Sequence, residues 1–326
     1  MNSQLTMKLV VSVLVLVSCT FASDFSSSAR NFSLEFLYHT QLESGEHIVI
    51  SPLGIWSLMT ALVIGAEGES QSQLLKALRL PTAETSVNSD NYENFELSIL
   101  SGYESVMSTV LDTADGSVDL ISRNYMLVAE SFKVNPQYKR KLRNFLKTLI
   151  TNLNLDTATG VAESANELIK KSGAMTSDLF QPEDFSISRF IITNVIKFKG
   201  NWKIPFNESA TKVEPFYDEN KNKIGEANMM FKEDAVRYSN VQTLQSSVLE
   251  LPYGNDENNV FISTAVHNAN IEVTETGMPG PVVTAAEFQD RVLSSFEANR
   301  PFIYFGMQKL TATIIFSGIY SKPSVL

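Results

Sequence analysis

Three histidines, His39, His47 and His267, are the first candidates for acid–base or metal chemistry in this chain. Their spacing fits neither the HExxH helix of zinc hydrolases nor a zinc-ligand pair. A GxSxG nucleophile turn and a glycine-rich phosphate loop are also absent from the sequence. The single cysteine, Cys19, lies in an N-terminal apolar run, so the mature chain has no thiolate ligand and no disulfide. The sequence therefore predicts a protein that is not an enzyme and that holds no metal and no cofactor.

The N-terminus is typical of a secretory signal peptide. Lys8 precedes the apolar run 9–19, and small residues frame a cleavage point after Ala22. The run is too short to span a bilayer, which needs about 20 apolar residues, and no later segment is long and uncharged enough. We therefore expect a signal peptide at 1–22 and a secreted, extracellular protein with no membrane partner.

The overall charge of the chain is acidic, with 26 basic and 36 acidic residues and a net charge of −10 at pH 7. A surface of this sign repels a phosphate backbone, so nucleic acid is not expected as a partner. Asn31 and Asn207 each begin an N-glycosylation sequon, which matters because the chain is expected to be exported. A sequon can also stay unused.

The periodicity of the chain predicts helices first and strands afterwards. Helical patterns cover 29–39 and 53–64, and a turn at Gly65 and Gly68 precedes a short helix that Ser70 or Ser72 could cap. A further helix opens at Asn135-Pro136, with an apolar side made of Tyr138, Leu142, Phe145, Leu146 and Leu149. From Phe190 onwards β-branched and aromatic runs dominate, which indicates an α+β fold. No repeat or linker divides the chain, so we expect a single domain at 23–326.

The helix after Pro136 also carries a basic stripe. Lys139, Arg140, Arg143 and Lys147 fall within one arc opposite the apolar side. Such a stripe could bind an anionic polysaccharide, but it is more often simply the solvated face of a helix. The acidic net charge favours the second interpretation, so anionic polysaccharide is not expected as a partner.

Five blocks resemble the serpin family, and they occur in that family's order. The first is HIVISPLGIWSLMTALVIGAEGESQSQLLKALRL at 47–80, and the most diagnostic is ITNVIKFKGNW, which contains Asn194 and Trp202. The others are NYMLVAESFKVNP, NMMF with VLELPY, and NRPFIYF followed by TIIFSGIYSKP. The resemblance implies a monomeric α+β domain with three β-sheets, about nine helices and an exposed reactive loop near the C-terminus.

In inhibitory serpins the target protease cleaves this loop, which then inserts as a new strand into the large sheet and carries the acylated protease with it. HNANIEVTETG at 267–277 resembles the strand that leads into the hinge, with Glu275 and Gly277 in their expected places. The hinge then departs from the usual run of small residues, because it continues with Met278, Pro279, Gly280 and Pro281. Each proline removes a backbone donor, which a central inserted strand tolerates poorly.

The scissile bond implied by the resemblance is Arg291-Val292, counted from Gly277. Counting back from Pro301 places it one residue earlier, at Asp290. Arg291 suits a trypsin-like protease, whose pocket holds a buried carboxylate that pairs with arginine. Arg291 could equally be an ordinary exposed charge. His267 would lie near the base of the mobile region, where a structural role is favoured over a pH-sensitive one.

The chain is also shorter than the family pattern near 254–259. Serpins carry a long stretch of strands and helices between VLELPY and NVFISTAVHNANIEV, so roughly one-fifth of the expected fold, including part of the large sheet, is missing. An isoform, a gene-model artefact and a locally remodelled fold all fit this pattern. The leading hypothesis is an extracellular inhibitor of a trypsin-like serine protease. The alternatives are a non-inhibitory serpin, acting as a protease substrate, carrier or binding protein, and a misfolded product retained in the secretory pathway.

Overall fold

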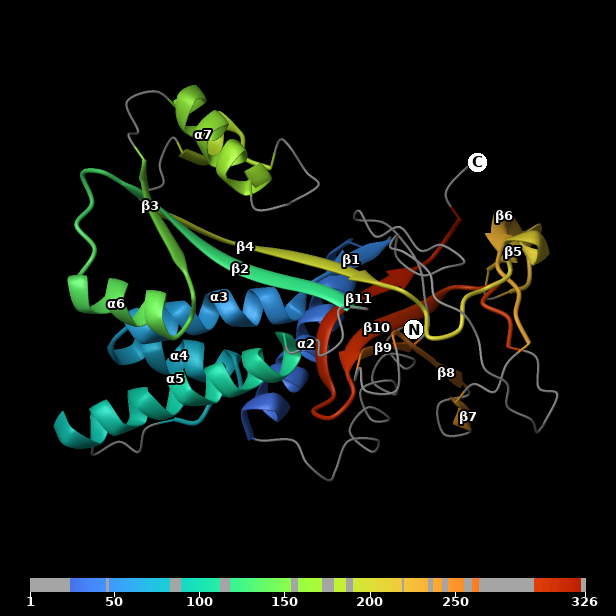
Figure 1. Ribbon diagram of the computed structural model, residues 1–326, viewed down its shortest axis with the longest axis horizontal. Coiled ribbons are helices and arrows are strands. Elements are labelled where there is room, and N and C mark those ends of the chain that lie inside the picture. The colour runs from blue at the N-terminus through green and yellow to red at the C-terminus, as the bar shows by residue number, and fades with distance from the viewer. Residues whose placement is uncertain are drawn as a thin grey trace. The chain divides into compact units, whose positions relative to one another are not determined.

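Figure 1 shows the computed structural model of the chain. The structure describes residues 24–44, 47–82, 89–111, 118–153, 158–171, 179–185, 190–218, 220–233, 237–241, 246–254, 260–263 and 296–323. The predicted signal peptide at 1–22 lies outside the described residues. The chain forms two compact units, each assembled from separate stretches of sequence: 1–52, 113–119 and 199–326 in the first, and 53–112 and 120–198 in the second. The single domain at 23–326 stays a prediction.

The first unit is built on a six-stranded antiparallel sheet in the order β1-β11-β10-β9-β8-β7. Its strands are β1 (Ile48–Ile50), β7 (Arg237–Val241), β8 (Ser246–Pro252), β9 (Val260–Ser263), β10 (Phe302–Gln308) and β11 (Thr313–Tyr320). Helix α2 (Asp24–Ser44) packs Leu34 and Leu37 against Phe305, Met307 and Ile314 of this sheet. The nearly continuous burial of β10 and β11 explains why both strands are apolar at almost every position.

A smaller hairpin completes the strands of the first unit. Strands β5 (Lys212–Tyr217) and β6 (Lys223–Met229) pair antiparallel, and the short 3-10 helix η2 (Glu208–Ala210) precedes them. Phe216 is fully buried and packs edge-on against Tyr320 at the end of β11, with ring centroids 5.2 Å apart. This aromatic contact holds the hairpin against the C-terminal strand of the larger sheet.

The second unit packs helices on both faces of a three-stranded sheet. Its helices are α3 (Pro52–Gly65), α4 (Gly68–Ala77), α5 (Ser89–Leu111), α6 (Pro136–Asn144), α7 (Ala158–Lys171) and the 3-10 helix η1 (Pro182–Phe185). The sheet order is β3 (Leu149–Leu153), β2 (Val118–Ala129), β4 (Phe190–Gly200), with β2 and β3 parallel. The last residues of β4 belong to the first unit.

Strand β2 shows why this sheet is covered on both sides. Tyr125 and Leu127 share one buried cluster with Val161 and Ala165 of α7, whereas Asn124 bonds to α3. Successive strand residues point to opposite faces, so Tyr125 and Leu127 face α7 while Asn124, the residue before Tyr125, faces α3. Figure 1 shows α7 and α3 on opposite sides of β2 and β4.

The described residues confirm the predicted α+β class, with six α-helices, two 3-10 helices and three sheets among them. The predicted helices at 29–39 and 53–64 are confirmed within α2 and α3. The predicted cap at Ser70 or Ser72 was wrong, because α4 already begins at Gly68 and Ser72 Oγ donates to the Gly68 carbonyl from inside the helix. Helix α5 was not predicted from the sequence.

Helix α6 begins where predicted but ends earlier. The Asn135 side chain accepts a hydrogen bond from the Gln137 backbone N–H at 2.8 Å, which is the expected cap. The helix stops at Asn144, and Lys147 adopts a positive φ of 49° before β3 begins. Leu149 was therefore wrongly placed on the apolar side of this helix. It is the first residue of β3 and is 48% exposed.

Candidate functional site

The predicted reactive loop lies between two described stretches of chain, 260–263 and 296–323. Residues 264–295 lie outside the described residues, and with them all predicted hinge and scissile positions: His267, Glu275, Gly277, Met278, Pro279, Gly280, Pro281, Asp290, Arg291 and Val292. These positions stay predictions. The geometry of the site is therefore the geometry of the anchors on either side.

Both anchors belong to the first unit. On the N-terminal side, Ser263 ends β9 and is paired across the sheet with Glu250 of β8 and Phe305 of β10. On the C-terminal side, the Asn299 carbonyl accepts a hydrogen bond from the Tyr217 backbone N–H at 2.9 Å. The chain then enters β10 at Phe302. The residue before segment 264–295, Ser263, is thus held in the six-stranded sheet, and Asn299, shortly after the segment, is hydrogen-bonded to β5.

Two of the sequence blocks that resemble serpins meet next to the expected shortening. Trp202 and Tyr253 stack with ring centroids 4.4 Å apart and planes 10° apart. The Gly254 N–H donates to the Asn201 carbonyl at 2.8 Å, and the Lys203 N–H donates to the Pro252 carbonyl at 2.9 Å. Burial of the Tyr253 ring raises the pKa of its phenol well above the ordinary value. These contacts fix the chain just before 255–259, which lie outside the described residues.

Strands β8 and β9 then form an antiparallel pair on either side of those residues, with Leu251 opposite Ile262 and Pro252 opposite Phe261. Gly254 adopts a positive φ of 66°, a conformation that glycine accepts without steric strain. The predicted shortening near 254–259 is thus bracketed by two strands that are neighbours in the sheet. The position of that shortening stays a prediction.

A buried polar network lies under the sheet of the second unit. The Asn124 amide of β2 donates to Ser57 Oγ of α3 at 2.6 Å, and Ser57 Oγ lies 2.6 Å from the Tyr103 hydroxyl of α5. Asn194 of β4 donates to Asn124 Oδ1 at 2.8 Å and to Ser122 Oγ at 3.1 Å. The network therefore links the adjacent strands β2 and β4 to each other and to two helices.

The burial and mutual hydrogen bonding of these side chains indicate that the network stabilises the fold. Ser57, Tyr103 and Asn124 are each no more than 3% exposed, so each polar group needs a partner inside the protein. Burial raises the pKa of the Tyr103 hydroxyl, although hydrogen bonds to Ser57 and Asn124 act in the opposite direction. The sequence carried a signal for this site, because isolated serine and asparagine residues within apolar runs have to be paired once buried.

The remaining predicted site residues are separate from one another. Asn31 is exposed on α2, and Asn207 is exposed and caps η2 through its side-chain oxygen, which accepts from the Ser209 N–H at 3.0 Å. His39 is exposed, whereas His47 accepts a hydrogen bond from the Ser321 N–H at 3.2 Å and packs on Tyr320. Among the described residues, no group of histidine, cysteine and acidic side chains could hold a metal ion.

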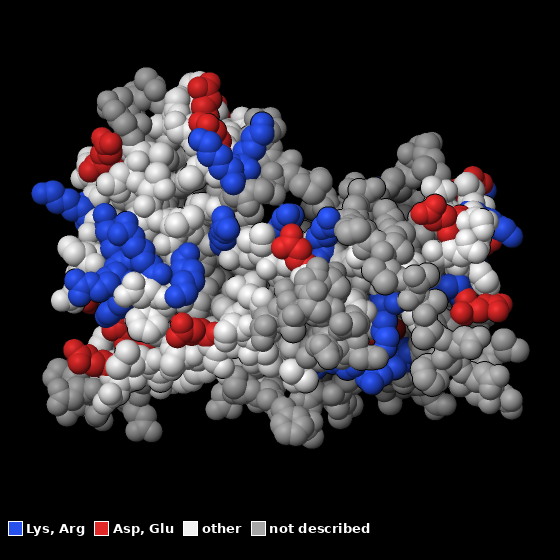
Figure 2. All heavy atoms as spheres, viewed as in Figure 1, with Lys and Arg blue, Asp and Glu red and all other residues white. Residues whose placement is uncertain are grey.

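Figure 2 shows lysine and arginine side chains gathered over α6, at the left of the view. Arg140 and Arg143 are exposed on this helix, and Lys139 is half-buried. Lys147 lies beyond the helix end, where its Nζ donates to the Asn144 carbonyl at 2.6 Å. The stripe is therefore shorter than the sequence predicted. Within the described part of the chain, no helix is both long and apolar enough to span a bilayer.

Comparisons with family models, curated proteins and solved structures all match serpins. A family model described as "Serpin (serine protease inhibitor)" matches residues 27–262 and 254–323. Human "Serpin I2" is 26% identical over 247 residues, which are 75% of this chain and 58% of that protein. "Corticosteroid-binding globulin" of Saimiri sciureus is 25% identical over 252 residues, 76% of this chain and 59% of that protein. The chain thus spans less than two thirds of the length of these relatives.

A solved structure titled "Cleaved Serpin 42Da" superimposes with a TM-score of 0.74 at 16% sequence identity. The match covers 92% of this chain and 99% of that structure. At this level of identity the likeness concerns the fold alone.

Proposed function

Because the chain belongs to the serpin family, we propose that it is an extracellular inhibitor that presents segment 264–295 to a trypsin-like serine protease. The observation that carries the proposal is the match to a family model described as a serine protease inhibitor. That match extends over both anchors of the segment. The anchors themselves support it, because a bait must be held at both ends to enter a protease cleft in a defined conformation. In this role the chain is a ligand of an enzyme and not a catalyst.

Arg291-Val292 is the bond that we propose the protease attacks. An arginine side chain is matched by the buried carboxylate at the base of a trypsin-like pocket, which it can pair with through two hydrogen bonds. Asp290, the alternative position, is an acid and would be repelled by the same carboxylate. The proposed partner is accordingly a protease that cleaves after arginine.

A second candidate function, that of a protease substrate or carrier, is favoured by the hinge. Loop insertion requires Glu275, Gly277 and the residues after them to become part of a central strand, and Pro279 and Pro281 lack the N–H groups which that strand would donate. A relative whose name is corticosteroid-binding globulin also supports a binding role. In this case the protease would cut the loop and dissociate.

Cleavage-site mapping tests the proposed bait residue directly. Secreted protein is incubated briefly with a small amount of trypsin, and the first cut is located by mass spectrometry. We expect the first cut after Arg291 in the wild type, and its loss in Arg291→Ala. Arg300→Ala is the matched control, because Arg300 is exposed between the loop and β10 and should leave the cut unchanged. A first cut elsewhere in the wild type, or an unchanged cut pattern in Arg291→Ala, would overturn the assignment.

A further inference from the structure

The hairpin of β5 and β6 in the first unit (Figure 1) is a sheet of only two strands among the described residues. A two-stranded hairpin by itself is marginally stable in water, so its faces and edges need partners. One face is covered, because Phe216 packs on Tyr320 and Pro323 leaves no room for a Cβ at Gly225. The hairpin is therefore held in place by the end of the chain, and the two strand edges decide what else it can bind.

The outer edge of β5 is closed to a further strand. Pro215 has no N–H, so it cannot belong to an antiparallel pair that exchanges two hydrogen bonds. Pro215 and the residue opposite, Glu226, therefore form the other kind of pair, in which both backbones point away from the partner strand. The Tyr217 N–H also points away from β6, because it donates to the Asn299 carbonyl at 2.9 Å. The missing donor at Pro215 and the contact with Asn299 leave no continuous ladder along β5.

The same alternation shows which groups of β6 point to its open edge. Because Glu226 lies opposite Pro215, the N–H and C=O groups of Glu226 and Asn228 point away from β5, whereas those of Ala227 point toward it. Glu226 and Asn228 are both exposed, and no described residue bonds to these outward groups. Strand β6 thus presents two donors and two acceptors in a row, which is the template that another strand requires.

The residues of β6 favour one register for pairing with an identical strand. If Glu226 lay opposite Glu226 of a second copy, two like charges would meet, which destabilises a cross-strand pair. A twofold axis at Ala227 instead places Glu226 opposite Asn228 of the second copy. The Asn228 amide can then donate to the carboxylate, and the outward backbone groups meet in hydrogen-bonded pairs. An axis at Gly225 would require Ile224, which the register with β5 skips as a bulge.

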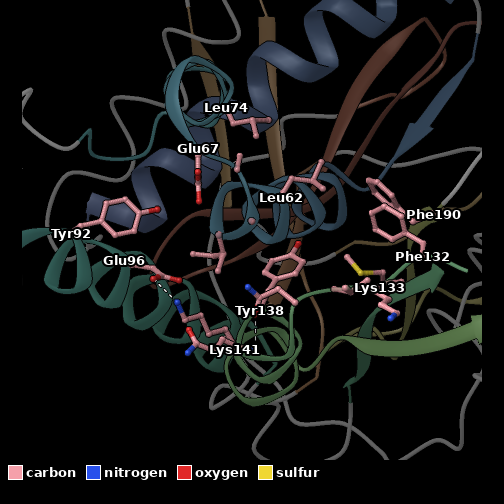
Figure 3. A pocket seen from close by; sticks show the side chains of 17 residues that line it. Leu62, Glu67, Leu74, Tyr92, Glu96, Phe132, Lys133, Tyr138, Lys141 and Phe190 are labelled. Carbon is pink, nitrogen blue, oxygen red and sulfur yellow. Dashed lines mark hydrogen bonds and ion pairs between the residues drawn. The ribbon is translucent and has the colours of Figure 1, made fainter. Parts of the chain in front are cut away.

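Glu226 has a carboxylate oxygen available for this contact. Its Oε1 accepts a hydrogen bond from Lys223 Nζ at 2.6 Å, and Oε2 has no partner among the described residues. The pair of Glu96 and Lys141 is different, because it joins α5 to α6 and the Glu96 side chain is only 11% exposed (Figure 3). The pair in β6 lies within one strand and is about half exposed, so it leaves Glu226 accessible. Lys223 also offsets the charge of Glu226, which weakens repulsion between the two carboxylates near the axis.

We propose that β6 pairs antiparallel with β6 of a second copy of this chain, about a twofold axis at Ala227, and forms a four-stranded sheet across a dimer. The proposal departs from the monomer that the family resemblance implies. A twofold contact uses the same strand of both copies, so association stops at two. Pairing over 225–229 buries less surface than the roughly 1,200–2,000 Å² of a stable interface, so the dimer should dissociate on dilution. It involves no residue of 264–295 and does not depend on protease inhibition.

Sedimentation velocity of the intact secreted chain, from about 10 to about 500 μM, tests for the dimer. We expect the average sedimentation coefficient to rise with concentration toward the value of a dimer and no further. Asn228→Pro removes an outward N–H and no bond to β5, so it should keep the hairpin and abolish the rise. Asn228→Ala keeps that N–H and should still dimerise. A wild type that stays monomeric or forms larger species, or an Asn228→Pro variant that still dimerises, would contradict the proposal.

A cysteine at the axis tests the register, and it also decides the matter if unfolding curves show that Asn228→Pro is misfolded. Cys19 belongs to the predicted signal peptide, so Ala227→Cys gives the secreted chain a single thiol. Residues opposite each other in a non-hydrogen-bonded pair have Cα atoms about 4.5 Å apart, which suits a disulfide.

We expect Ala227→Cys to form a disulfide-linked dimer at least about tenfold faster than Val213→Cys, as followed on non-reducing gels. Val213 is the matched control because it is 55% exposed but lies on β5, away from the proposed axis. Equal rates, or faster linkage of Val213→Cys, would show that random collision forms the bond and would rule out this pairing of β6.

Discussion

Replacing Asn124 by alanine should measure how strongly the buried polar network stabilises the second unit. The substitution removes the 2.6 Å bond to Ser57 Oγ, the 2.8 Å bond from Asn194 and a longer bond of 3.4 Å to the Tyr103 hydroxyl. Ser57 and Tyr103 still bond to each other, and Asn194 keeps Ser122 as a partner, so no other group is left unpaired. The two short hydrogen bonds at about 1 kcal/mol each, with little from the 3.4 Å bond, and about 1 kcal/mol for the small void give a loss of about 2–3 kcal/mol.

The assay is urea unfolding followed by the fluorescence of Trp56, whose ring stacks on Tyr103 with centroids 5.8 Å apart. A Trp202→Phe background leaves Trp56 as the single tryptophan, because the chain has two. With a denaturant dependence of ~2–3 kcal/mol per molar, the unfolding midpoint should fall by about 1 M. Asn152→Ala is the control, since Asn152 is exposed on the neighbouring strand β3. Midpoints for the two variants that agree within about 0.2 M would refute the reasoning.

Three further predictions concern two glycines, a buried tyrosine and a glycosylation sequon. Gly318→Ala places a methyl group against the backbone oxygen of Ile48 and should lower the free energy of unfolding by about 2–3 kcal/mol. Gly68→Ala meets open space, and its φ of 59° should lower that free energy by only about 1 kcal/mol. Equal losses in thermal unfolding would contradict this. Burial raises the pKa of Tyr138 from 10.0 to about 12, so between these values the unfolded chain releases a proton that the folded chain keeps. Stability should therefore fall as pH rises through that window, and tyrosinate absorbance should lose a step near pH 12 in Tyr138→Phe. In protein secreted from eukaryotic cells, Asn207→Gln should remove one glycosidase-sensitive mass increment, and an unchanged mass would show that this sequon is unused.

Local signals allowed the sequence to predict some elements well. Asn135 followed by Pro136 marks the start of α6 because the amide caps the first turn and proline fits it, and the structure has that cap. The end of α6 carries no such signal, since Lys147 adopts a left-handed conformation without being glycine. The strands after Phe190 were also predicted from the sequence, because β-branched and aromatic residues suit buried sheet positions.

Helix α5 shows how an amphipathic pattern can be missed. Ile99, Tyr103, Val106 and Val110 are buried at helical spacing, which is a readable signal. Leu97, however, is 53% exposed on the same helix, so apolar residues occur on more than one face and blur the periodicity. The starting point of α4 was misjudged for another reason. Its N-cap residue, Glu67, makes no capping bond with its side chain, so the nearby serines gave a misleading start signal.

The candidate sites depended on contacts that sequence spacing does not encode. Glu96 looks like an ordinary solvated charge on a helix, and only its pairing with Lys141 explains its burial. The same is true of Asn124 and Asn194, which lie 70 positions apart and meet only because β2 and β4 are neighbours in the sheet. The two serpin-like sequence blocks that contain them could be recognised from the sequence, but the hydrogen bond between them could not.

The most direct test of the proposed inhibition is to mix the secreted protein with an equal amount of trypsin and separate the products by denaturing gel electrophoresis. Insertion of the cleaved loop traps the acylated protease, so we expect a stable band at the sum of the two masses and a matching loss of trypsin activity. Complete cleavage with free, fully active trypsin would contradict inhibition, and would instead identify the chain as a serpin that proteases cut without being trapped.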